Sequence, residues 1–253
     1  MHKTRPFRPR RASAQAPEGM VWTWGWHPVQ AALANDRREP PTRLLATPER
    51  APQLRSAAGG RLDTLEILPA AEIARELPQG AVHQGAAWLG APPEPMSVDD
   101  LAEPAAGVLL MLDQVTDPQN VGAIFRSAAA FGARGLILQD RHAPPLGGAL
   151  AKAAAGAVDR LPHARAVNLS RALERLEEAG WRAVGLAGEA GEPLEAVLDG
   201  RPTVLVLGSE GEGLRRLVAE HCDALAKIDM PGGFDSLNVS AAAAVALYAA
   251  TRR

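Results

Sequence analysis

Unbroken apolar runs alternate with helical patterns through the second half of the chain. Residues 107–112 (GVLLML) form a hydrophobic run that is typical of a strand buried on both faces of a parallel sheet. Further strands are predicted at residues 136–138, 183–186 and 203–207, and from Ile228. Helices are predicted at residues 118–131, with Phe131 on the apolar face, and at 169–178, 214–222 and 241–251. This alternation predicts an α/β domain with a mostly parallel, doubly wound sheet at residues 107–253.

A smaller α/β unit is predicted at residues 21–92, where short strand-like and helix-like segments alternate. Prolines and acidic residues mark residues 93–106 as a stiff, exposed linker. Residues 1–20, rich in Arg, Pro, Ala and Gln, are predicted to form a disordered arm. The alternating Trp22, Trp24 and Trp26 are expected on one strand face, where packing in a core and stacking on bases are equally compatible with the pattern.

The formal net charge of −2 argues against a uniformly basic nucleic-acid binder. That average conceals a basic start, because residues 1–18 hold five cations and one acid. Cys222 is the single cysteine and falls in an apolar-periodic stretch, so we expect a small buried side chain and no disulfide or cysteine metal site. The six histidines lack metal-ligand spacing, and no run has the length of a membrane helix or the form of a secretory signal. A cytosolic protein without a metal is therefore expected.

Polar loops follow the predicted strands, at the sheet edge where α/β proteins bind nucleotide-type ligands. The loop after residues 107–112 reads DQVTDPQN and contains neither a GxGxxG nor a GxxxxGK[ST] pattern, which excludes a standard dinucleotide or P-loop site. Glycines gather instead at residues 208–213 (GSEGEG). Glu210 and Glu212 make that loop a poor phosphate cradle, and it suits an adenosine, a cationic group or a ribose hydroxyl better. Residues 230–240 (MPGGFDSLNVS) then place small polar side chains before an alanine-rich helix, which Asn238 or Ser240 is expected to cap.

Three ordered motifs carry a resemblance to the SpoU/TrmH family of S-adenosylmethionine-dependent RNA ribose 2′-O-methyltransferases. They span roughly residues 107–253 and read Asp113-x-Val115-x-Asp117-Pro118-x-Asn120-x-Gly122-Ala123-x-x-Arg126-Ser127, Gly208-Ser209-Glu210-Gly211-x-Gly213 and Ser236-Leu237-Asn238-Val239-Ser240. Residues 21–92 also resemble the small RNA-binding domain of family members that act on large-subunit rRNA, through Gly25-x-His27-x-Val29 and Gly80-Ala81-Val82-His83-Gln84-Gly85.

The resemblance implies a SPOUT-type fold, in which the C-terminal α/β domain holds a deep trefoil knot and acts as a homodimer. It implies S-adenosylmethionine as cofactor and a guanosine ribose of 23S rRNA as the methyl acceptor. Two alternatives stay open at this point. One is a methyltransferase that acts on tRNA, and the other is a non-catalytic RNA-binding factor of ribosome assembly on the same scaffold.

Site residues are likewise implied by the motifs. Arg126 would activate the ribose hydroxyl, Asn120 would orient Arg126 or the ribose, and Glu210 would anchor Asn120, Arg126 or a partner loop. Ser236 and Asn238 would hold substrate or loops by hydrogen bonds. The cofactor would bind near Gly208, Ile228 and Leu237, beside residues 186–188. Asp229 departs from the proline usual in this stretch of the family, which puts the geometry of that loop in question.

Overall fold

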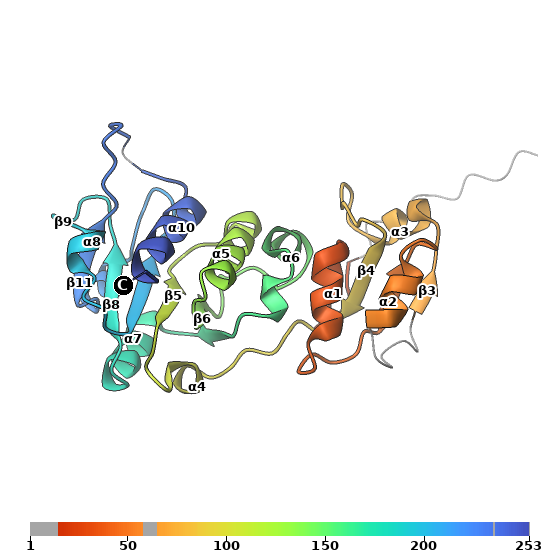
Figure 1. Cartoon of the computed structure of the whole chain (residues 1–253), viewed down its shortest axis with the longest axis horizontal. Helices are drawn as coiled ribbons and strands as arrows, with labels where there is room; N and C mark the ends of the chain where they lie inside the picture. Colours follow the sequence, from red (N-terminus) through yellow and green to blue (C-terminus); the bar gives the residue numbers. More distant parts are fainter. Residues whose placement is uncertain (1–14, 58–64, 235, 253) are drawn as a thin grey trace, which may run out of the picture.

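The computed structural model describes residues 15–57, 65–234 and 236–252, which form two sheets (Figure 1). Each sheet has its own buried core. We call residues 15–90 the small domain and residues 107–252 the large domain. Residues 1–14 of the predicted arm lie outside the described residues. Its end, however, packs on the small domain, because Ala16 and Met20 contact a buried cluster there.

The small domain is a four-stranded sheet in the order β1-β4-β2-β3, flanked by short helices. Its strands are β1 (Val21–Trp24), β2 (Arg43–Ala46), β3 (Leu65–Ile67) and β4 (Ala86–Gly90). Its helices are α1 (Trp26–Ala34), α2 (Ala51–Ala57) and α3 (Ala70–Glu76). Trp22 and Trp24 are buried in the core, which favours the packing alternative for both. The expectation of a shared strand face is wrong for Trp26, because the chain turns at Gly25 (φ 102°) and Trp26 begins α1.

The large domain is a seven-stranded parallel sheet in the order β7-β6-β5-β10-β8-β11-β9, which confirms the predicted fold class. Its strands are β5 (Val108–Leu112), β6 (Gly135–Gln139), β7 (His163–Ala166), β8 (Arg182–Leu186), β9 (Glu192–Pro193), β10 (Thr203–Leu207) and β11 (Ala224–Lys227). Its helices are α5 (Pro118–Ala130), α6 (Gly148–Ala154), α7 (Leu169–Glu178), α8 (Leu194–Val197), α9 (Arg216–Glu220) and α10 (Val239–Ala250), with a 3₁₀ turn, η1, at Ala157–Asp159. The expectation of a strand from Ile228 is wrong, because β11 pairs with β8 only as far as Ala226 and ends at Lys227.

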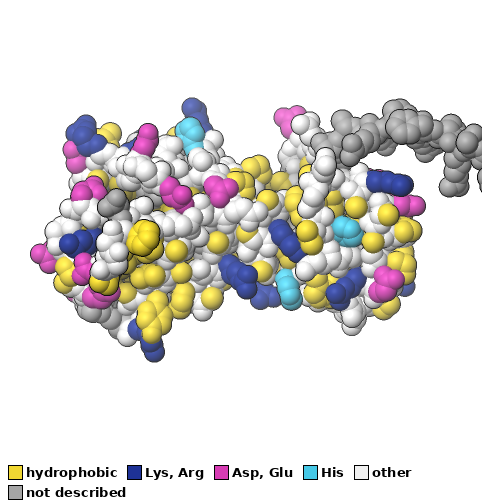
Figure 2. All heavy atoms as spheres, turned by 90° about the horizontal axis from the view of Figure 1, so that it is seen from above, with side chains coloured by type: hydrophobic (Ala, Val, Ile, Leu, Met, Phe, Trp, Pro, Cys, Tyr) yellow, Lys and Arg dark blue, Asp and Glu magenta, His cyan; other side chains and the backbone are white. Residues whose placement is uncertain are grey.

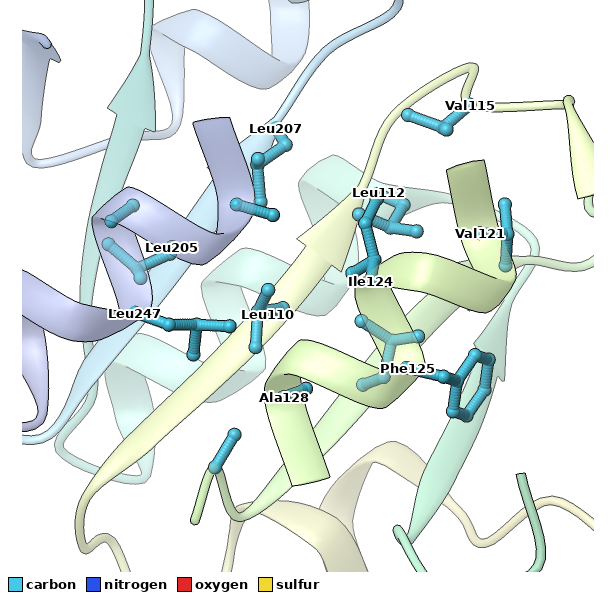
Figure 3. Packing of buried hydrophobic residues seen from close by; sticks show 14 of the residues in the cluster. Leu110, Leu112, Val115, Val121, Ile124, Phe125, Ala128, Leu205, Leu207 and Leu247 are labelled. Atoms are coloured by element: carbon cyan, nitrogen blue, oxygen red, sulfur yellow. The ribbon is translucent and has the colours of Figure 1, made fainter. Parts of the chain in front are cut away.

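Both faces of the large sheet are covered, as its unbroken apolar strands require. Figure 3 shows α5 and α10 against one face, with Ile124 and Phe125 of α5 and Leu247 of α10 packed near strand residues such as Leu110. On the other face lie α7, α9 and the short helix α4 (Val98–Ala102). Phe131 was predicted on the buried stripe of α5, but its side chain is 37% exposed and contacts Tyr248 edge to face. The helix ends at Ala130, so Phe131 no longer follows the helical period.

The segment that joins the domains is only partly a free linker. Ser97 caps α4 by accepting a hydrogen bond from the backbone of Asp100, and Met96 bridges to β7. Val98 and Leu101 are buried against the large sheet. The prediction of an exposed linker is therefore wrong for residues 96–102, because proline and acid content conceals the apolar side of this short helix.

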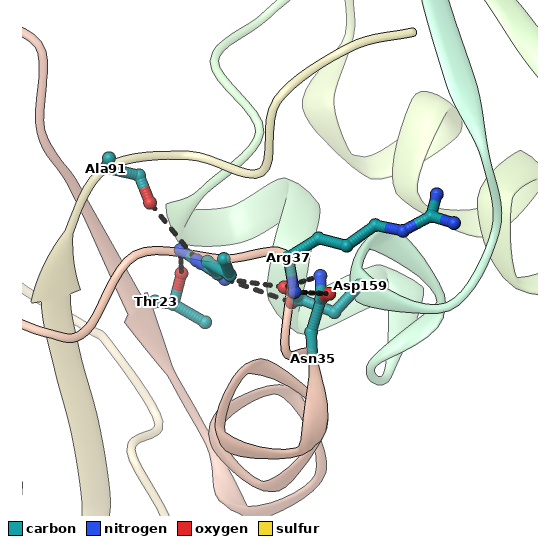
Figure 4. A network of polar contacts seen from close by, with 6 residues as sticks. Thr23, Asn35, Arg37, Ala91 and Asp159 are labelled. Carbon is teal, nitrogen blue, oxygen red and sulfur yellow. Dashed lines mark hydrogen bonds and ion pairs between the residues drawn. The ribbon is translucent and has the colours of Figure 1, made fainter. Parts of the chain in front are cut away.

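A buried ion pair ties the small domain to the large one (Figure 4). Nη1 of Arg38 donates to both carboxylate oxygens of Asp159 at 3.0 Å, and both side chains are at most 2% exposed. The same guanidinium donates to the carbonyl of Ala91 and the hydroxyl of Thr23, and Asn35 donates to Asp159. Every polar group of the pair thus has partners, and the two domains are held in one arrangement.

Glycines allow the domains to approach closely around this pair. A Cβ at Gly147 would lie 2.6 Å from the Cβ of Val21, and one at Gly156 would lie 2.9 Å from the Cβ of Ala31. Real Cβ atoms do not approach so closely, so both positions require glycine in this arrangement. The contacts join the segments around α6 to β1 and α1.

Candidate functional site

The ends of three neighbouring strands enclose a cavity of about 670 Å³ at the carboxyl edge of the large sheet. Its walls come from the ends of β8, β10 and β11 and from the loops that follow them. Residues 228–234 rise from this edge at the top left of Figure 1, in blue. All three residues predicted to bind the cofactor line the cavity: Gly208, Ile228 and Leu237. The strand end at residues 186–188 lines it too, as expected.

The loop after β10 is a tight turn that only glycine permits at its base. Ser209 and Gly213 exchange backbone hydrogen bonds of 3.1 and 3.0 Å, which closes the turn. A Cβ at Gly208 would lie 2.1 Å from the carbonyl carbon of Gly213. The glycines therefore shape the cavity wall by close backbone packing, and they leave backbone groups at its surface.

Glu210 fastens this turn to the starts of two helices. Its Oε1 accepts hydrogen bonds from Nδ2 of Asn120 at 3.0 Å, from Nδ2 of Asn238 at 2.7 Å and from the backbone of Val239 at 3.2 Å. Nδ2 of Asn238 also donates to Oδ1 of Asn120 at 2.9 Å. The carboxylate thus lies at the first turns of α5 and α10, where helix dipoles favour negative charge. We call Asn120, Glu210 and Asn238 the polar triad.

Helix caps explain why the triad forms where it does. Asp117, directly before Pro118 at the first helical position, caps α5 by accepting a hydrogen bond from the backbone of Asn120. Asn238 caps α10 through Oδ1, which accepts from the backbone of Ser240 and Ala241. Its Nδ2 is left to face Glu210 and Asn120. One side chain therefore starts the helix and closes the triad, so capping and site-building do not exclude each other.

Ser236 lines the cavity, but Arg126 does not. The Arg126 side chain is exposed on the solvent stripe of α5. Within the described ranges, no hydrogen bond or ion pair joins Arg126 to Asn120 or Glu210. The expected anchoring by Glu210 is therefore found for Asn120 and not for Arg126. Six positions separate Asn120 from Arg126, and these positions lie on different sides of an α-helix.

Asp229 leaves the cavity wall intact. Its side chain is 64% exposed and lies 3.8 Å from Nζ of Lys227, whereas its neighbours Ile228 and Met230 line the cavity. The departure from proline at this position thus places a carboxylate outward and keeps the adjacent backbone at the wall.

Asp113 is a positioning residue that the candidate set omitted. It is fully buried at the end of β5, and its carboxylate accepts hydrogen bonds from the backbone of Arg215 at 2.9 Å and from Nε of Arg215 at 2.7 Å. This pairing holds the far end of the loop that starts at Gly208. The available signal was a carboxylate directly after an unbroken apolar strand, which needs a partner once it is buried.

The remaining features limit other classes of site. The cavity wall holds Glu189, Glu210 and Glu212 against one cation, Lys227, so it favours a ligand with positive charge.

Across the described parts of the chain, no cluster of three or more His, Cys, Asp or Glu side chains is arranged to hold a metal ion. None of the helices in those ranges has the length and apolarity that crossing a bilayer requires. Cys222 is partly buried against the sheet, and burial raises the pKa of its thiol to about 12.

Comparisons with known proteins agree with this geometry. The chain is 38% identical to an uncharacterized tRNA/rRNA methyltransferase of Synechocystis over 95% of its own length, and it spans 64% of that relative. It is 37% identical to the 23S rRNA (guanosine-2′-O-)-methyltransferase RlmB of Pseudomonas aeruginosa, covering 91% of this chain and 95% of the relative. The AdoMet-bound crystal structure of an rRNA methyltransferase from Sinorhizobium meliloti superposes with a TM-score of 0.79 at 25% identity, covering 92% of this chain and 87% of the other.

The match to a family is direct. Residues 107–248, which are more than half of the chain and contain the cavity and the polar triad, match the SpoU rRNA Methylase family. The chain therefore belongs to the SpoU rRNA methylase family.

Proposed function

We propose that this protein transfers a methyl group from S-adenosylmethionine to a ribose 2′-hydroxyl of RNA, with a guanosine of 23S rRNA as the acceptor. The observation that carries the proposal is the polar triad at the mouth of a cavity formed by three strand ends. The name of the Pseudomonas relative supports the choice of acceptor, because this chain covers nearly all of that protein. For a protein that acts on rRNA we propose a location in the cytoplasm.

The cavity fits the proposed cofactor. Its volume lies within the range of roughly 300–1,000 Å³ typical of small-molecule sites. Backbone groups around Gly208 and Ile228 would hold the adenosine, and the acidic wall suits the positive sulfonium. When bound, S-adenosylmethionine supplies an activated methyl group. The protein's part is to orient the acceptor in line with that group, and positioning alone contributes a large share of such rate enhancements.

Arg126 is assigned to the acceptor side of the reaction. A guanidinium keeps its proton throughout the physiological pH range, so it cannot serve as the base. It would stabilise the alkoxide that develops at O2′ or bind the adjacent phosphate, while the proton leaves to phosphate or water. Asn120, Glu210 and Asn238 act as positioning residues, since they fix the loops on which cofactor and ribose meet.

We further propose that the protein acts as a homodimer with composite sites. Arg126 does not line the cavity of its own chain. The helices α5 and α10 lie side by side, and Phe131, Val245 and Tyr248 expose apolar side chains on or next to these helices. A second copy on this face would cover the apolar side chains and bring its Arg126 toward the first copy's cavity. The trefoil knot belongs to the same proposal, supported by the tight packing of Gly208 on Gly213.

Mixing two inactive variants tests the composite site. Arg126→Ala removes the arginine and Gly208→Ala blocks the loop, so each homodimer should be inactive. A random mixture should regain about a quarter of the native activity, because half of the dimers are mixed and each has one intact site. No recovery, in a mixture shown to exchange subunits, would contradict the composite site.

Mapping 2′-O-methyl groups tests the function itself. The purified protein and S-adenosylmethionine are incubated with 23S rRNA and with tRNA from cells that lack the gene. We expect one guanosine of 23S rRNA to gain the mark. A gain in tRNA alone would favour the tRNA enzyme, whose support is the name of the Synechocystis relative. Absence of S-adenosylmethionine binding in calorimetry would favour a non-catalytic assembly factor.

A further inference from the structure

Two cations from different domains meet at the junction. Nζ of Lys152, on α6 of the large domain, donates to Oε1 of Gln84 at 2.6 Å. The same oxygen accepts from the backbone of Trp26 at 3.2 Å. The guanidinium of Arg50 lies 4.3 Å from the centre of the Trp26 ring, and a Cβ at Gly85 would lie 2.8 Å from Cγ of Arg50. We call Lys152, Arg50, His83, Gln84 and Trp26 the junction cluster.

Among the described residues, no carboxylate pairs with the cations of the junction cluster. In the described part of the chain no ion pair involves Lys152 or Arg50, and Arg50 donates only to the neutral Gln53. The nearby Glu49 bonds to its own backbone and to Thr47. Burial lowers the pKa of His83, and the charge of Lys152 lowers it further. The positive charge of this local basic site therefore comes from Lys152 and Arg50, on a chain whose net charge is −2.

One cation of this site, Lys152, lies on α6, which packs against α5, the helix that carries Asn120. Figure 2 looks down on the molecule from above, and Lys, Arg and His side chains gather in this view at the waist between the two domains. The path from the polar triad is short. Asn120 lies two residues before Gly122, and a Cβ at Gly122 would lie 2.4 Å from the carbonyl oxygen of Leu150 on α6. Lys152 follows two residues later on that helix.

We propose that the junction cluster binds the phosphate backbone of the substrate RNA and guides it from the small domain to the polar triad. This rests on the proposed function, because it names how that substrate is held. The site requires both domains: Lys152 comes from one, and Arg50, Gln84 and Trp26 come from the other. The Arg38–Asp159 pair and the contacts of Gly147 and Gly156 fix the spacing between these groups.

The chemistry of the cluster suits RNA phosphate. Arg50 is pre-organised by stacking on Trp26 and by its hydrogen bond to Gln53, so it loses little freedom on binding phosphate through its planar fork. Lys152 adds a point charge held by one neutral hydrogen bond, which phosphate can displace. An RNA strand that neutralises both cations releases counterions, and this contribution to affinity falls with salt.

The salt dependence of RNA affinity tests this proposal. Binding of deproteinised 23S rRNA is measured over a range of salt for the full chain and for Lys152→Gln, Arg50→Gln and the double variant. Each single change should lower the slope of log K against log salt by about 0.7–0.9 and weaken binding about fivefold at physiological salt, and the double change about twentyfold. Lys152→Arg should keep the native slope, because it keeps the charge.

Controls separate a binding role from folding and from catalysis. Arg171→Gln removes an exposed cation on α7, the helix on the opposite face of the sheet, and should leave the slope unchanged. The affinity for S-adenosylmethionine should stay native in the junction variants, because none of the substituted residues lines the cavity. A slope equal to that of Arg171→Gln would overturn the junction proposal. Absence of methyl transfer by the native protein would overturn the proposed function and leave the binding comparison intact.

Discussion

Nδ2 of Asn238 donates a hydrogen bond of 2.7 Å to Oε1 of Glu210, and this contact joins the first residue ahead of α10 to the turn after β10. Because Asn238 also caps α10, the position of that helix and the shape of the cavity are fixed by one side chain. Loosening the triad should therefore reach both cofactor binding and the orientation of the acceptor.

Replacing Glu210 tests this coupling. Glu210→Ala leaves three donors without their acceptor, so the single-turnover rate should fall on the order of 100-fold, with weaker S-adenosylmethionine binding. Glu210→Gln keeps an acceptor oxygen and loses the charge, and about a tenfold fall is expected. Glu212→Ala is the control for loss of charge, since Glu212 belongs to the same acidic wall and has no hydrogen bond among the described residues. Equal rates for the two Ala variants would contradict the coupling.

Gly208 tests the close packing of the same loop. Gly208→Ala places a Cβ 2.1 Å from the carbonyl carbon of Gly213, so the turn must open and the cavity wall must shift. We expect S-adenosylmethionine binding to fall at least tenfold in calorimetry. Gly191→Ala is the matched control, because nothing lies within 4 Å of its Cβ and its backbone is not left-handed. Native affinity in Gly208→Ala would show that the loop has room to adjust.

Arg126 should affect methyl transfer without affecting cofactor binding. Its side chain lies off the cavity, so S-adenosylmethionine affinity should stay native in Arg126→Ala. The single-turnover rate should fall about 100- to 1,000-fold, as for the loss of one preorganised donor. Arg126→Lys keeps the charge and loses the planar fork, so it should recover only part of the rate. A near-native rate in Arg126→Lys would exclude a role specific to the guanidinium.

Local signals in the sequence were sufficient for features that neighbouring residues determine. The Asp117 cap, the unbroken apolar strands and the end of α7 before Gly180 follow from short stretches of chain. Features set by distant residues were missed. The end of β11 before Ile228 depends on the pairing of β11 with β8. The helix α6 was missed because most side chains of residues 148–154 are small and show no clear apolar period.

The candidate site shows the same division. The motifs placed Gly208, Ile228 and Leu237 together, and the structure confirms that all three line one cavity. The motifs did not show whether Asn120 or Arg126 pairs with Glu210. The pairing depends on the direction in which each side chain leaves α5, and the structure gives Asn120 as the partner. The Arg38–Asp159 pair joins residues 121 positions apart, and nothing in either local stretch indicates the other partner.

That pair should stabilise the arrangement of the two domains. Asp159→Asn leaves the buried guanidinium of Arg38 without its counter-charge, and the free energy of unfolding should fall by about 3–5 kcal/mol in urea. Exchanging both partners for apolar residues, Arg38→Met with Asp159→Leu, should cost less than either single change because no buried charge is left unpaired. A double variant as unstable as the sum of the singles would contradict this account.

His163 should make stability depend on pH. Burial lowers the pKa of this histidine from 6.5 to about 4, with the charge of Arg165 as a smaller cause, and its buried Nε2 has no hydrogen-bond partner among the described residues. Between pH 6.5 and pH 4 the His163 ring is therefore protonated in the unfolded chain and neutral in the folded chain. The contribution of the neutral His163 ring to the free energy of unfolding is fully present above pH 6.5 and is lost as the pH falls toward 4. The loss between pH 7 and pH 5 is about 2 kcal/mol. Urea unfolding at pH 7 and pH 5 gives the loss of free energy of unfolding between the two pH values for the native protein and for His163→Gln. This loss should be smaller by about 2 kcal/mol in the variant. An equal difference in the two proteins would assign the acid sensitivity to other groups.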